Sequence, residues 1–199
     1  QLVQDTEQLF DELQNILRGV FLIGDLSQKT SDKIVSYGER LSSLIVNKLI
    51  TGSQLYDSTK FIKTNRQFKS HIPDLSRSNE LIRKTFADMP PPDIAIVPGF
   101  ISSSIDENDI TNLGRGGSDY TAAMIAAAMN ATMLEIWTDV NGFMTADPKI
   151  INSAYVIDEL SFTEAIELSN FGAKVIYPPT IFPVYHKNIP IYIRNTFSP

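Results

Sequence analysis

Residues 111–121 read Thr-Asn-Leu-Gly-Arg-Gly-Gly-Ser-Asp-Tyr-Thr, a glycine-rich run that leads directly into an alanine-rich segment. The composition of residues 118–129 predicts a helix. Glycines let backbone N–H groups approach an anion, and the free N–H groups at a helix start favour negative charge. Arg115 adds a planar guanidinium that suits a carboxylate or a phosphate. An ordinary turn with Ser118 or Asp119 as the helix cap is the alternative, although such a turn needs no cation.

Predicted helices and strands alternate on both sides of this run. Apolar spacing predicts further helices over 5–17 (with Gly19 as a stop), from a cap at Thr30 or Ser31 to Gly52, and over 77–87, 164–169 and 179–185. Runs rich in apolar and β-branched residues predict strands near 54–57, 61–63, 94–97, 132–137 and 189–194, with long loops over 102–117 and 138–149. This alternation predicts an α/β fold with a parallel or mixed sheet covered on both faces.

A second polar stretch, residues 137–149, follows a predicted strand and reads Trp-Thr-Asp-Val-Asn-Gly-Phe-Met-Thr-Ala-Asp-Pro-Lys. Open α/β sheets bind their ligands at the carboxyl ends of strands, so Thr138, Asp139 and Lys149 are candidate ligand contacts. The alternative is a structural loop whose charges are solvated.

Two shorter segments carry weaker signals. Gly38 lies inside a predicted helix, where glycine costs about 1 kcal/mol relative to alanine, so we expect something to pack closely against it. Glu39 could then accept a hydrogen bond from a substrate ammonium, or else form part of a solvated face. Gly172 has the place of a residue that ends a helix, and Lys174 follows it, where a lone lysine usually interacts with the helix dipole.

Composition excludes several classes of protein. The 199 residues contain 17 Lys and Arg against 23 Asp and Glu, a net charge of −6, which argues against a nucleic-acid or anionic-membrane surface. The chain has no cysteine, which excludes disulfides and thiolate metal sites and fits a reducing cytoplasm. No apolar run reaches the roughly 18–20 residues of a membrane span. His71 and His186 are isolated, so we predict no protein-held metal site.

Taken together and in this order, these motifs resemble the kinase domain of the aspartokinases, within the amino acid kinase family. The resemblance rests on residues 38–43, 99–100, 113–120, 137–140 and 171–175, and residues 162–169 and 193–196 are most similar to the form fused to homoserine dehydrogenase. It implies phosphorylation of L-aspartate by ATP and Mg²⁺ to 4-phospho-L-aspartate, the first step of the pathway to lysine, threonine, methionine and isoleucine. It also implies a three-layer αβα sandwich with an open, mainly parallel sheet, and a cytoplasmic enzyme that is a homo-oligomer at full length.

The resemblance further implies two lobes and a role for each motif. The amino-acid lobe would span about 1–115 and the nucleotide lobe about 116–199. Glu39 would bind the substrate ammonium and Arg115 a substrate carboxylate, in a pocket completed by Phe100, Gly116, Gly117 and Ser118. Asp119 would be catalytic by organising cations around the phosphates, together with Lys174. The nucleotide contacts would be Thr138, Asp139, Met144, Lys149, Lys174 and Val175.

The sequence departs from the family pattern in four places. The family usually opens with a strand that carries Lys-Phe-Gly-Gly-Thr-Ser, which this sequence lacks. We therefore expect the first strand to be missing, the chain to start inside the domain, and this polypeptide to be inactive alone. Met144, Lys149 and Tyr177 stand where the family has Tyr, Arg and His. A non-catalytic amino-acid or anion-binding module of the same fold, and a kinase for another amino acid such as glutamate, stay open as alternatives.

Overall fold

The computed structural model describes residues 2–67, 70–87, 94–147, 150–173 and 175–198. It is an α/β protein that divides into two compact units, Gln1–Ser118 and Asp119–Pro199. The predicted α/β class and its parallel-rich sheets are confirmed, with the described strands pairing in three groups. The expected absence of a first strand stays a prediction. Among the described residues, no helix has both the length and the apolar character that a membrane crossing requires.

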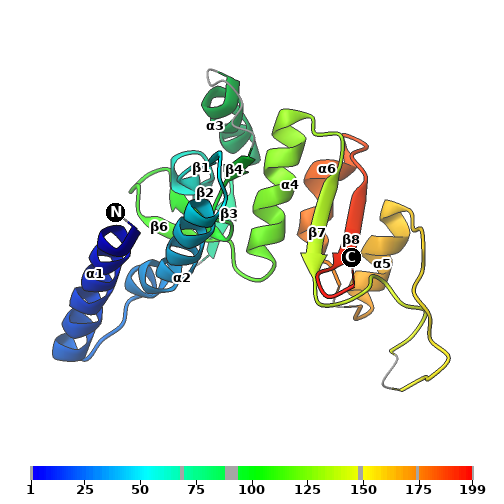
Figure 1. The fold of residues 1–199 in the computed structure, drawn as a ribbon, viewed down its shortest axis with the longest axis horizontal. Coiled ribbons are helices and arrows are strands. Elements are labelled where there is room, and N and C mark those ends of the chain that lie inside the picture. The colour runs from blue at the N-terminus through cyan, green and yellow to red at the C-terminus, as the bar shows by residue number, and fades with distance from the viewer. Residues whose placement is uncertain (1, 68–69, 88–93, 148–149, 174, 199) are drawn as a thin grey trace. The chain divides into compact units, whose positions relative to one another are not determined.

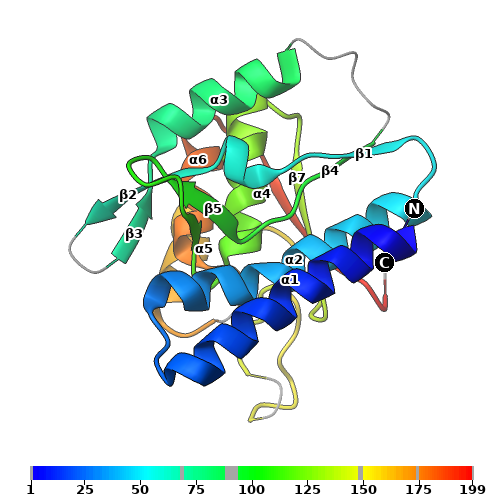
Figure 2. The ribbon, with the colours of Figure 1, turned by 90° about the vertical axis from the view of Figure 1, so that its left-hand side faces the viewer.

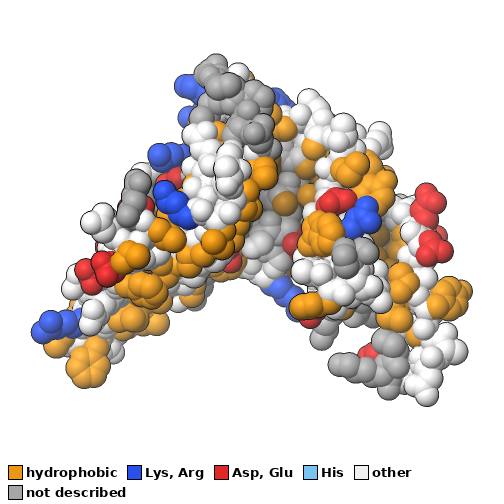
Figure 3. Space-filling view, in the orientation of Figure 1, with side chains coloured by type: hydrophobic (Ala, Val, Ile, Leu, Met, Phe, Trp, Pro, Cys, Tyr) orange, Lys and Arg blue, Asp and Glu red, His pale blue; other side chains and the backbone are white. Residues whose placement is uncertain are grey.

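The first unit begins with a helical hairpin of α1 (Leu2–Ile23) and α2 (Gln28–Leu49), which lie side by side in Figures 1 and 2. Helix α1 runs through Gly19, so the predicted stop there is wrong; one isolated glycine lowers helix stability by only about 1 kcal/mol. The chain instead leaves the helix at Gly24, whose φ is +70°. Hydrophobic side chains stay exposed over α1 (Figure 3), among them Phe10, Leu17 and Phe21.

Helix α2 begins earlier than the sequence predicts. Ser27 is its cap, and the Ser27 Oγ accepts a hydrogen bond from the Thr30 N–H at 3.2 Å. The predicted caps Thr30 and Ser31 lie inside the helix, so that prediction is wrong. All three residue types are good caps, and the backbone decides between them, because only Ser27 has the extended conformation that a cap requires.

The strands of the first unit form two groups. Strand β1 (Ser53–Leu55) pairs in parallel with β4 (Ile94–Ile96). A second sheet has the order β3-β2-β5-β6, from β2 (Lys63–Gln67), β3 (Ser70–Pro73), β5 (Ile101–Ser104) and β6 (Ile110–Asn112). In that sheet β2 and β5 are parallel and the two outer pairs are antiparallel. Helix α3 (Leu75–Ala87) and a short 3₁₀ turn (Ser58–Lys60) complete the unit.

The prediction of a long irregular loop over residues 102–117 is wrong. Strands β5 and β6 pair within it, with Ser102 opposite Thr111 and Ser103 opposite Ile110. Every residue of β5 is buried although three of the four are serines. A strand that buries hydroxyls lacks the apolar alternation by which strands are recognised in sequence.

The second unit is built on two parallel strands, β7 (Leu134–Thr138) and β8 (Ile191–Asn195). Figure 1 shows α4 (Gly117–Met129), α5 (Phe162–Asn170) and α6 (Ile181–Tyr185) around them, and a 3₁₀ turn (Pro178–Thr180) precedes α6. Its core is mainly aliphatic, and side chains of α5 and β8 pack partly buried against it. Six of its buried residues are Ala123, Leu134, Ile136, Ile181, Val184 and Ile189.

The predicted helix end at Gly172 is confirmed. Gly172 has a φ of +110°, and its N–H donates to the Ser169 carbonyl oxygen at 3.3 Å. The Ala173 N–H donates to the Leu168 carbonyl oxygen at 2.9 Å, which completes a Schellman motif. At the other end of α5, Ser161 and Glu164 form a capping box. Gly172 therefore sets the direction in which the chain leaves α5.

Candidate functional site

The glycine loop packs against the chain that follows β4. A Cβ added to Gly99 would lie 2.7 Å from the Ser118 Cα, and one added to Gly117 would lie 3.2 Å from the Phe100 Cα. The first distance is shorter than real Cβ atoms show, so Gly99 requires glycine; at Gly117 the contact with Phe100 is tight, and the Leu113 Cβ would lie only 2.9 Å away. Three predicted substrate contacts, Phe100, Gly117 and Ser118, are thus brought together within the first unit.

Phe100 has a φ of +67°, a left-handed conformation that is rare for a bulky residue. Its carbonyl oxygen accepts a hydrogen bond from the Leu113 N–H at 2.8 Å, which ties it to the start of the glycine loop. Strain of this kind persists where the surroundings impose it and concentrates at functional sites. The strained backbone at Phe100 is therefore an independent indication that this corner of the unit is functional.

The loop itself is a tight turn that exposes a cation. Gly114 and Gly116 have φ values of +69° and +67°, and the Gly117 N–H donates to the Gly114 carbonyl oxygen at 3.0 Å. Arg115 lies exposed between them, and helix α4 begins at Gly117. An exposed guanidinium beside the N–H groups of a helix start can bind a carboxylate or a phosphate.

Helix α2 turns a polar face toward the interior of the unit. Asp32, Ser36 and Ser43 are buried, and Glu39 is half-buried at the same helical spacing. The apolar stripe predicted for this helix is wrong in part, because Ile45 and Leu49 are exposed. A Cβ on Gly38 would meet no described atom within 4 Å, so the predicted close packing there is also wrong. The helix covers a polar region, which is what a site for a charged small molecule requires.

Helix α2 packs against β6, and the sheet that contains β6 is polar as well. The Thr111 hydroxyl lies 2.9 Å from the Thr64 hydroxyl and 2.8 Å from the Ser102 hydroxyl, and all three side chains are buried. Buried hydroxyls are stable only when they are hydrogen-bonded, as these are. The first unit therefore contains a structured polar region between a helix and a sheet.

Two residues that the sequence reasoning missed connect these parts. Asp32 on α2 accepts a hydrogen bond from the Asn112 side chain at 2.6 Å, and Asn112 in turn accepts one from the Gly114 N–H at 3.1 Å. Asp32 lies two helical turns before Glu39, which was the available signal. Asn112 lies next to the glycine run but is of a type common in any turn.

The predicted nucleotide contacts lie in the second unit at the carboxyl end of β7. The Thr138 carbonyl oxygen accepts from the Thr196 N–H at 2.8 Å, and the Thr138 hydroxyl donates to the exposed Asp139 at 3.2 Å. Met144 is half-buried and pairs with Val156 in an isolated bridge. Val175 packs partly buried against the aliphatic core. Lys149 and Lys174 lie outside the described residues.

Asp119 lies in the first turn of α4 and is partly buried. Burial raises the pKa of the Asp119 carboxyl above its usual value, because the ionised form loses solvation. Such a carboxylate would be stabilised by a cation, which fits the predicted role beside a nucleotide and Mg²⁺. Within the described parts of the chain, no three His, Asp or Glu side chains gather as metal ligands.

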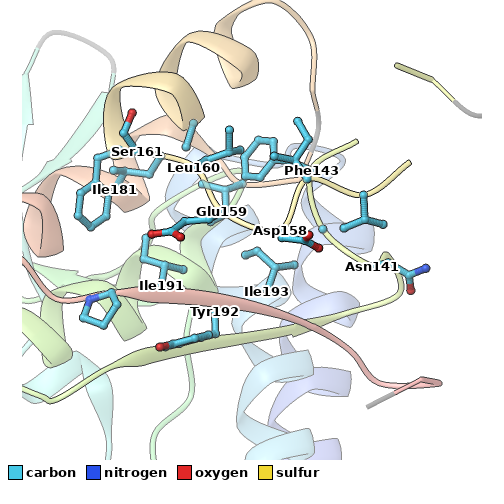
Figure 4. A pocket seen from close by; sticks show the side chains of 17 residues that line it. Asn141, Phe143, Asp158, Glu159, Leu160, Ser161, Ile181, Ile191, Tyr192 and Ile193 are labelled. Atoms are coloured by element: carbon cyan, nitrogen blue, oxygen red, sulfur yellow. The ribbon is translucent and has the colours of Figure 1, made fainter. Parts of the chain in front are cut away.

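A cavity of about 630 Å³ opens in the second unit, between β8 and the segment that leads into α5 (Figure 4). Ile191 and Ile193 lie on one side of β8 in this view and Tyr192 on the other. Phe143, Leu160 and Ile181 add apolar lining, and Asp158 and Glu159 are the charged residues among its described lining. None of the predicted contact residues that the structure describes lines this cavity, and the carboxylates of Asp158 and Glu159 would repel phosphate.

Comparison with known proteins places this geometry in context. A model of the "Amino acid kinase family" matches residues 7–195. Lysine-sensitive aspartokinase 3 of Escherichia coli (strain K12) is 34% identical over 198 residues, which are 95% of this chain and 44% of that protein. Bifunctional aspartokinase/homoserine dehydrogenase 2, chloroplastic, of Arabidopsis thaliana is 37% identical, over 94% of this chain and 21% of that protein. The chain thus spans less than half the length of these relatives.

Solved structures agree. Escherichia coli aspartokinase III in complex with aspartate and ADP superimposes with a TM-score of 0.86 at 34% identity, over 98% of this chain and 44% of that one. Uridylate kinase from Archaeoglobus fulgidus has a TM-score of 0.52 at 19% identity over 92% of this chain and 70% of that one, which is a likeness of fold alone.

Proposed function

Since the chain belongs to the amino acid kinase family, we propose that it is the kinase part of an enzyme that transfers the γ-phosphoryl group of ATP to the side-chain carboxylate of L-aspartate. The product would be 4-phospho-L-aspartate, which would enter the pathway to lysine, threonine, methionine and isoleucine. Support comes from the relatives and from aspartokinase III, whose structure contains aspartate and ADP. The cytoplasmic location and the homo-oligomeric assembly stay predictions.

The observation that carries the proposal is the polar region of the first unit. L-aspartate has one ammonium and two carboxylates, so its site needs an acceptor for the first and donors for the others. Glu39, on the polar face of α2, supplies an acceptor. Arg115 and the backbone N–H of Gly116 supply donors of the kind that bind carboxylates, and Gly117 would line the pocket beside them. Phe100 and Ser118 would complete the wall of the pocket.

The second unit would hold the nucleotide. Thr138 and Asp139 end a parallel strand, where nucleotides bind in open α/β sheets. Met144 can cover an adenine ring with its flexible thioether, and Val175, Lys149 and Lys174 would complete the site. Mg²⁺ usually binds through phosphate oxygens and one or two carboxylates, and it would neutralise charge on the phosphates. Asp119 would orient such cations as a carboxylate, and a nearby cation would offset the burial that raises the pKa of Asp119.

Phosphoryl transfer depends mainly on positioning and on neutralising the charge of the transferred group. The family lysine that does this belongs to a Lys-Phe-Gly-Gly motif, which these 199 residues do not contain. We therefore propose that this polypeptide alone binds aspartate but turns it over slowly or not at all. The alternative, a binding module without catalysis in any context, predicts the same behaviour for this polypeptide.

Calorimetric titration of the 199-residue protein with L-aspartate, L-glutamate and Mg·ATP tests the proposal. We expect aspartate to bind more tightly than glutamate, and Glu39→Gln and Arg115→Gln to weaken aspartate about tenfold or more. Glu80→Gln, an exposed change on α3, is the matched control and should have no effect. Absence of aspartate binding, or a preference for glutamate, would contradict the proposed substrate.

Activity is tested separately by trapping acyl phosphate with hydroxylamine. We expect little product from the 199-residue protein. If addition of a strand that carries Lys-Phe-Gly-Gly to the 199-residue protein restores turnover, the kinase proposal is supported. If the resulting complex binds both substrates but stays inactive, the non-catalytic binding module is favoured.

A further inference from the structure

We propose that Asp32 is a positioning residue for the amino-acid site. Acting through Asn112, it would hold the glycine loop at a set distance from α2, and thus Arg115 relative to Glu39. The inference rests on the proposed function, because it assigns the two ends of the substrate to these two side chains. None of the expected roles drawn from the sequence includes Asp32 or Asn112.

The contacts form a chain from the helix to the loop. The Asp32 Oδ1 accepts hydrogen bonds from Asn112 Nδ2 at 2.6 Å and from Gln28 Nε2 at 2.8 Å. The Asn112 Oδ1 accepts from the Gly114 N–H at 3.1 Å. Asp32 and Asn112 are 80 residues apart in sequence, so this bond joins two separate elements.

The chemistry of these groups gives the chain a direction. A carboxylate can only accept hydrogen bonds, so the Asn112 side chain must turn its NH₂ group toward Asp32. Its carbonyl oxygen is then left facing Gly114, where it can accept the backbone N–H. Asp32 thus selects one of the two orientations of the Asn112 amide, and that orientation holds the loop.

Burial makes the contact strong. Asp32 is only 4% exposed, and the groups that donate to its Oδ1 are neutral amides. A buried carboxylate is costly unless hydrogen bonds compensate it, and bonds to an ionised acceptor are shorter and stronger than neutral ones. An asparagine of the same shape would avoid that cost. An aspartate here is explained if its inability to donate is the property that matters.

The geometry links this contact to the proposed substrate groups. Glu39 follows Asp32 by two helical turns, on the same face of α2 and roughly 10 Å along its axis. Arg115 follows Gly114 directly. The loop is held at Leu113 by the Phe100 carbonyl oxygen and at Gly114 by Asn112. Loss of the second contact would free the segment that carries Arg115 while leaving Glu39 in place.

The decisive variant is Asp32→Asn. It keeps the size of the side chain but can donate to the Asn112 carbonyl oxygen, which lets the amide turn over and present its NH₂ group to the Gly114 N–H. We expect the L-aspartate affinity to fall about tenfold and the Gly114 amide to lose protection from hydrogen exchange. Asn112→Ala should have the same effects, although it leaves the Asp32 carboxylate unchanged and introduces no new hydrogen-bond donor. The double variant should bind aspartate no more weakly than the single variant with the lower affinity, because both changes break the same chain of contacts.

Gln28→Ala is the matched control. It removes the other hydrogen bond to Asp32 but does not touch the loop, so aspartate affinity and Gly114 protection should stay within twofold of the unmodified protein. Equal losses in Gln28→Ala and Asp32→Asn would show a merely structural role and overturn the inference. So would Asp32→Asn and Asn112→Ala proteins that fold and bind aspartate normally.

The two proposals fail in different ways. If the unmodified protein binds no aspartate, the proposed function fails. Hydrogen-exchange protection of the Gly114 amide in the Asp32→Asn protein then decides by itself whether Asp32 holds the loop. If Asp32→Asn does not fold, Asn112→Ala decides, since Asn112 is only half-buried and its truncation leaves the Gln28 hydrogen bond to Asp32 in place.

Discussion

A Cβ built on Gly99 would lie 2.7 Å from the Ser118 Cα and 2.9 Å from the Ser118 Cβ. The end of the segment that follows β4 therefore touches the backbone at the start of α4 directly. Ser118 has no freedom to move away without moving the glycine loop, because a Cβ on the adjacent Gly117 would lie only 2.9 Å from the Leu113 Cβ and 3.2 Å from the Phe100 Cα. This pair of contacts fixes the shape of the proposed amino-acid pocket.

Gly99→Ala should therefore destabilise the protein and weaken the binding of aspartate. Inserting a methyl group against the backbone costs typically 1–3 kcal/mol, and here relief of the clash would displace the glycine loop. Urea unfolding followed by circular dichroism measures the first effect and calorimetric titration the second. Gly19→Ala, at a half-buried helical position with no described atom within 4 Å of its Cβ, is the control and should stabilise. Normal aspartate affinity in a stable Gly99→Ala protein would contradict the close contact.

Gly38→Ala should stabilise the protein by about 0.5–1 kcal/mol, because alanine is the better helix former and its Cβ meets no described atom within 4 Å. Gly38 is exposed, whereas Glu39 lies on the inward face, so aspartate affinity should change by less than twofold. Thermal unfolding and titration of the same sample measure both. A loss of affinity would mean that the substrate, rather than protein, occupies the space beside Gly38.

The strain at Phe100 is measurable with two variants. Phe100→Ala and Phe100→Gly both remove the ring, but only glycine adopts the left-handed conformation without penalty. We expect Phe100→Gly to be more stable than Phe100→Ala by roughly 1–2 kcal/mol, although both should be less stable than the unmodified protein. Equilibrium unfolding in urea gives the difference. Equal stabilities would show that the backbone at residue 100 relaxes to a negative φ once the ring is gone.

Asp74 should stabilise α3 in a pH-dependent manner. Its Oδ1 accepts from the Arg77 N–H at 2.8 Å and its Oδ2 from the Asn65 side chain at 2.8 Å, and these bonds, the Arg77 N–H first, lower the pKa of the Asp74 carboxyl. A lowered pKa in the folded state adds stability above the unfolded value, near 4, that is lost as pH falls through the folded value. Asp74→Ala should cost about 1 kcal/mol at pH 7 and much less at pH 3.

Glu80→Gln is the control for that experiment, because it breaks only the exposed Arg77–Glu80 pair and should change the unfolding free energy by less than about 0.5 kcal/mol. A cost of Asp74→Ala that does not depend on pH would show that the carboxylate charge is unimportant to the cap.

Asp119→Asn should increase stability at neutral pH. Burial raises the pKa of Asp119 in the folded protein, so the stability contributed by its protonated form is complete below the unfolded pKa and is lost as pH rises through the folded value. Asparagine stays neutral, so its advantage should grow between about pH 4 and pH 7. Unfolding free energies at those two pH values test this. A less stable Asp119→Asn protein at pH 7 would indicate that a cation of the protein already pairs with Asp119.

Helices and strands whose ends are marked by local sequence signals were predictable. The helix of residues 118–129 and the strand before Thr138 occur within about two residues of their predicted bounds, and Gly172 ends α5 as expected. These signals are local: alanine-rich composition, a short apolar run, and a glycine where φ must be positive. Boundaries set by competing caps, as at Ser27, were not predictable, because several adjacent residues have suitable side chains.

Buried polar structure was missed throughout. Strand β5 buries three serines, and α2 buries Asp32 and Ser36 while Leu49 stays exposed. Sequence periodicity measures where apolar residues recur, so it predicts the wrong face when hydrogen bonds compensate burial. Periodicity also gave no sign of Asn112, which matters because it connects Asp32 to Gly114.

By itself, the sequence determined the α/β class, the family and the glycine loop with its exposed cation, because these depend on composition, order and local backbone freedom. Only the tertiary structure decided that Gly99 must lie against Ser118 and that Asp32 reaches Asn112 across 80 residues. The reason is physical: a hydrogen bond or a close contact between distant residues leaves no periodic trace along the chain, and it exists only once both elements are packed in place.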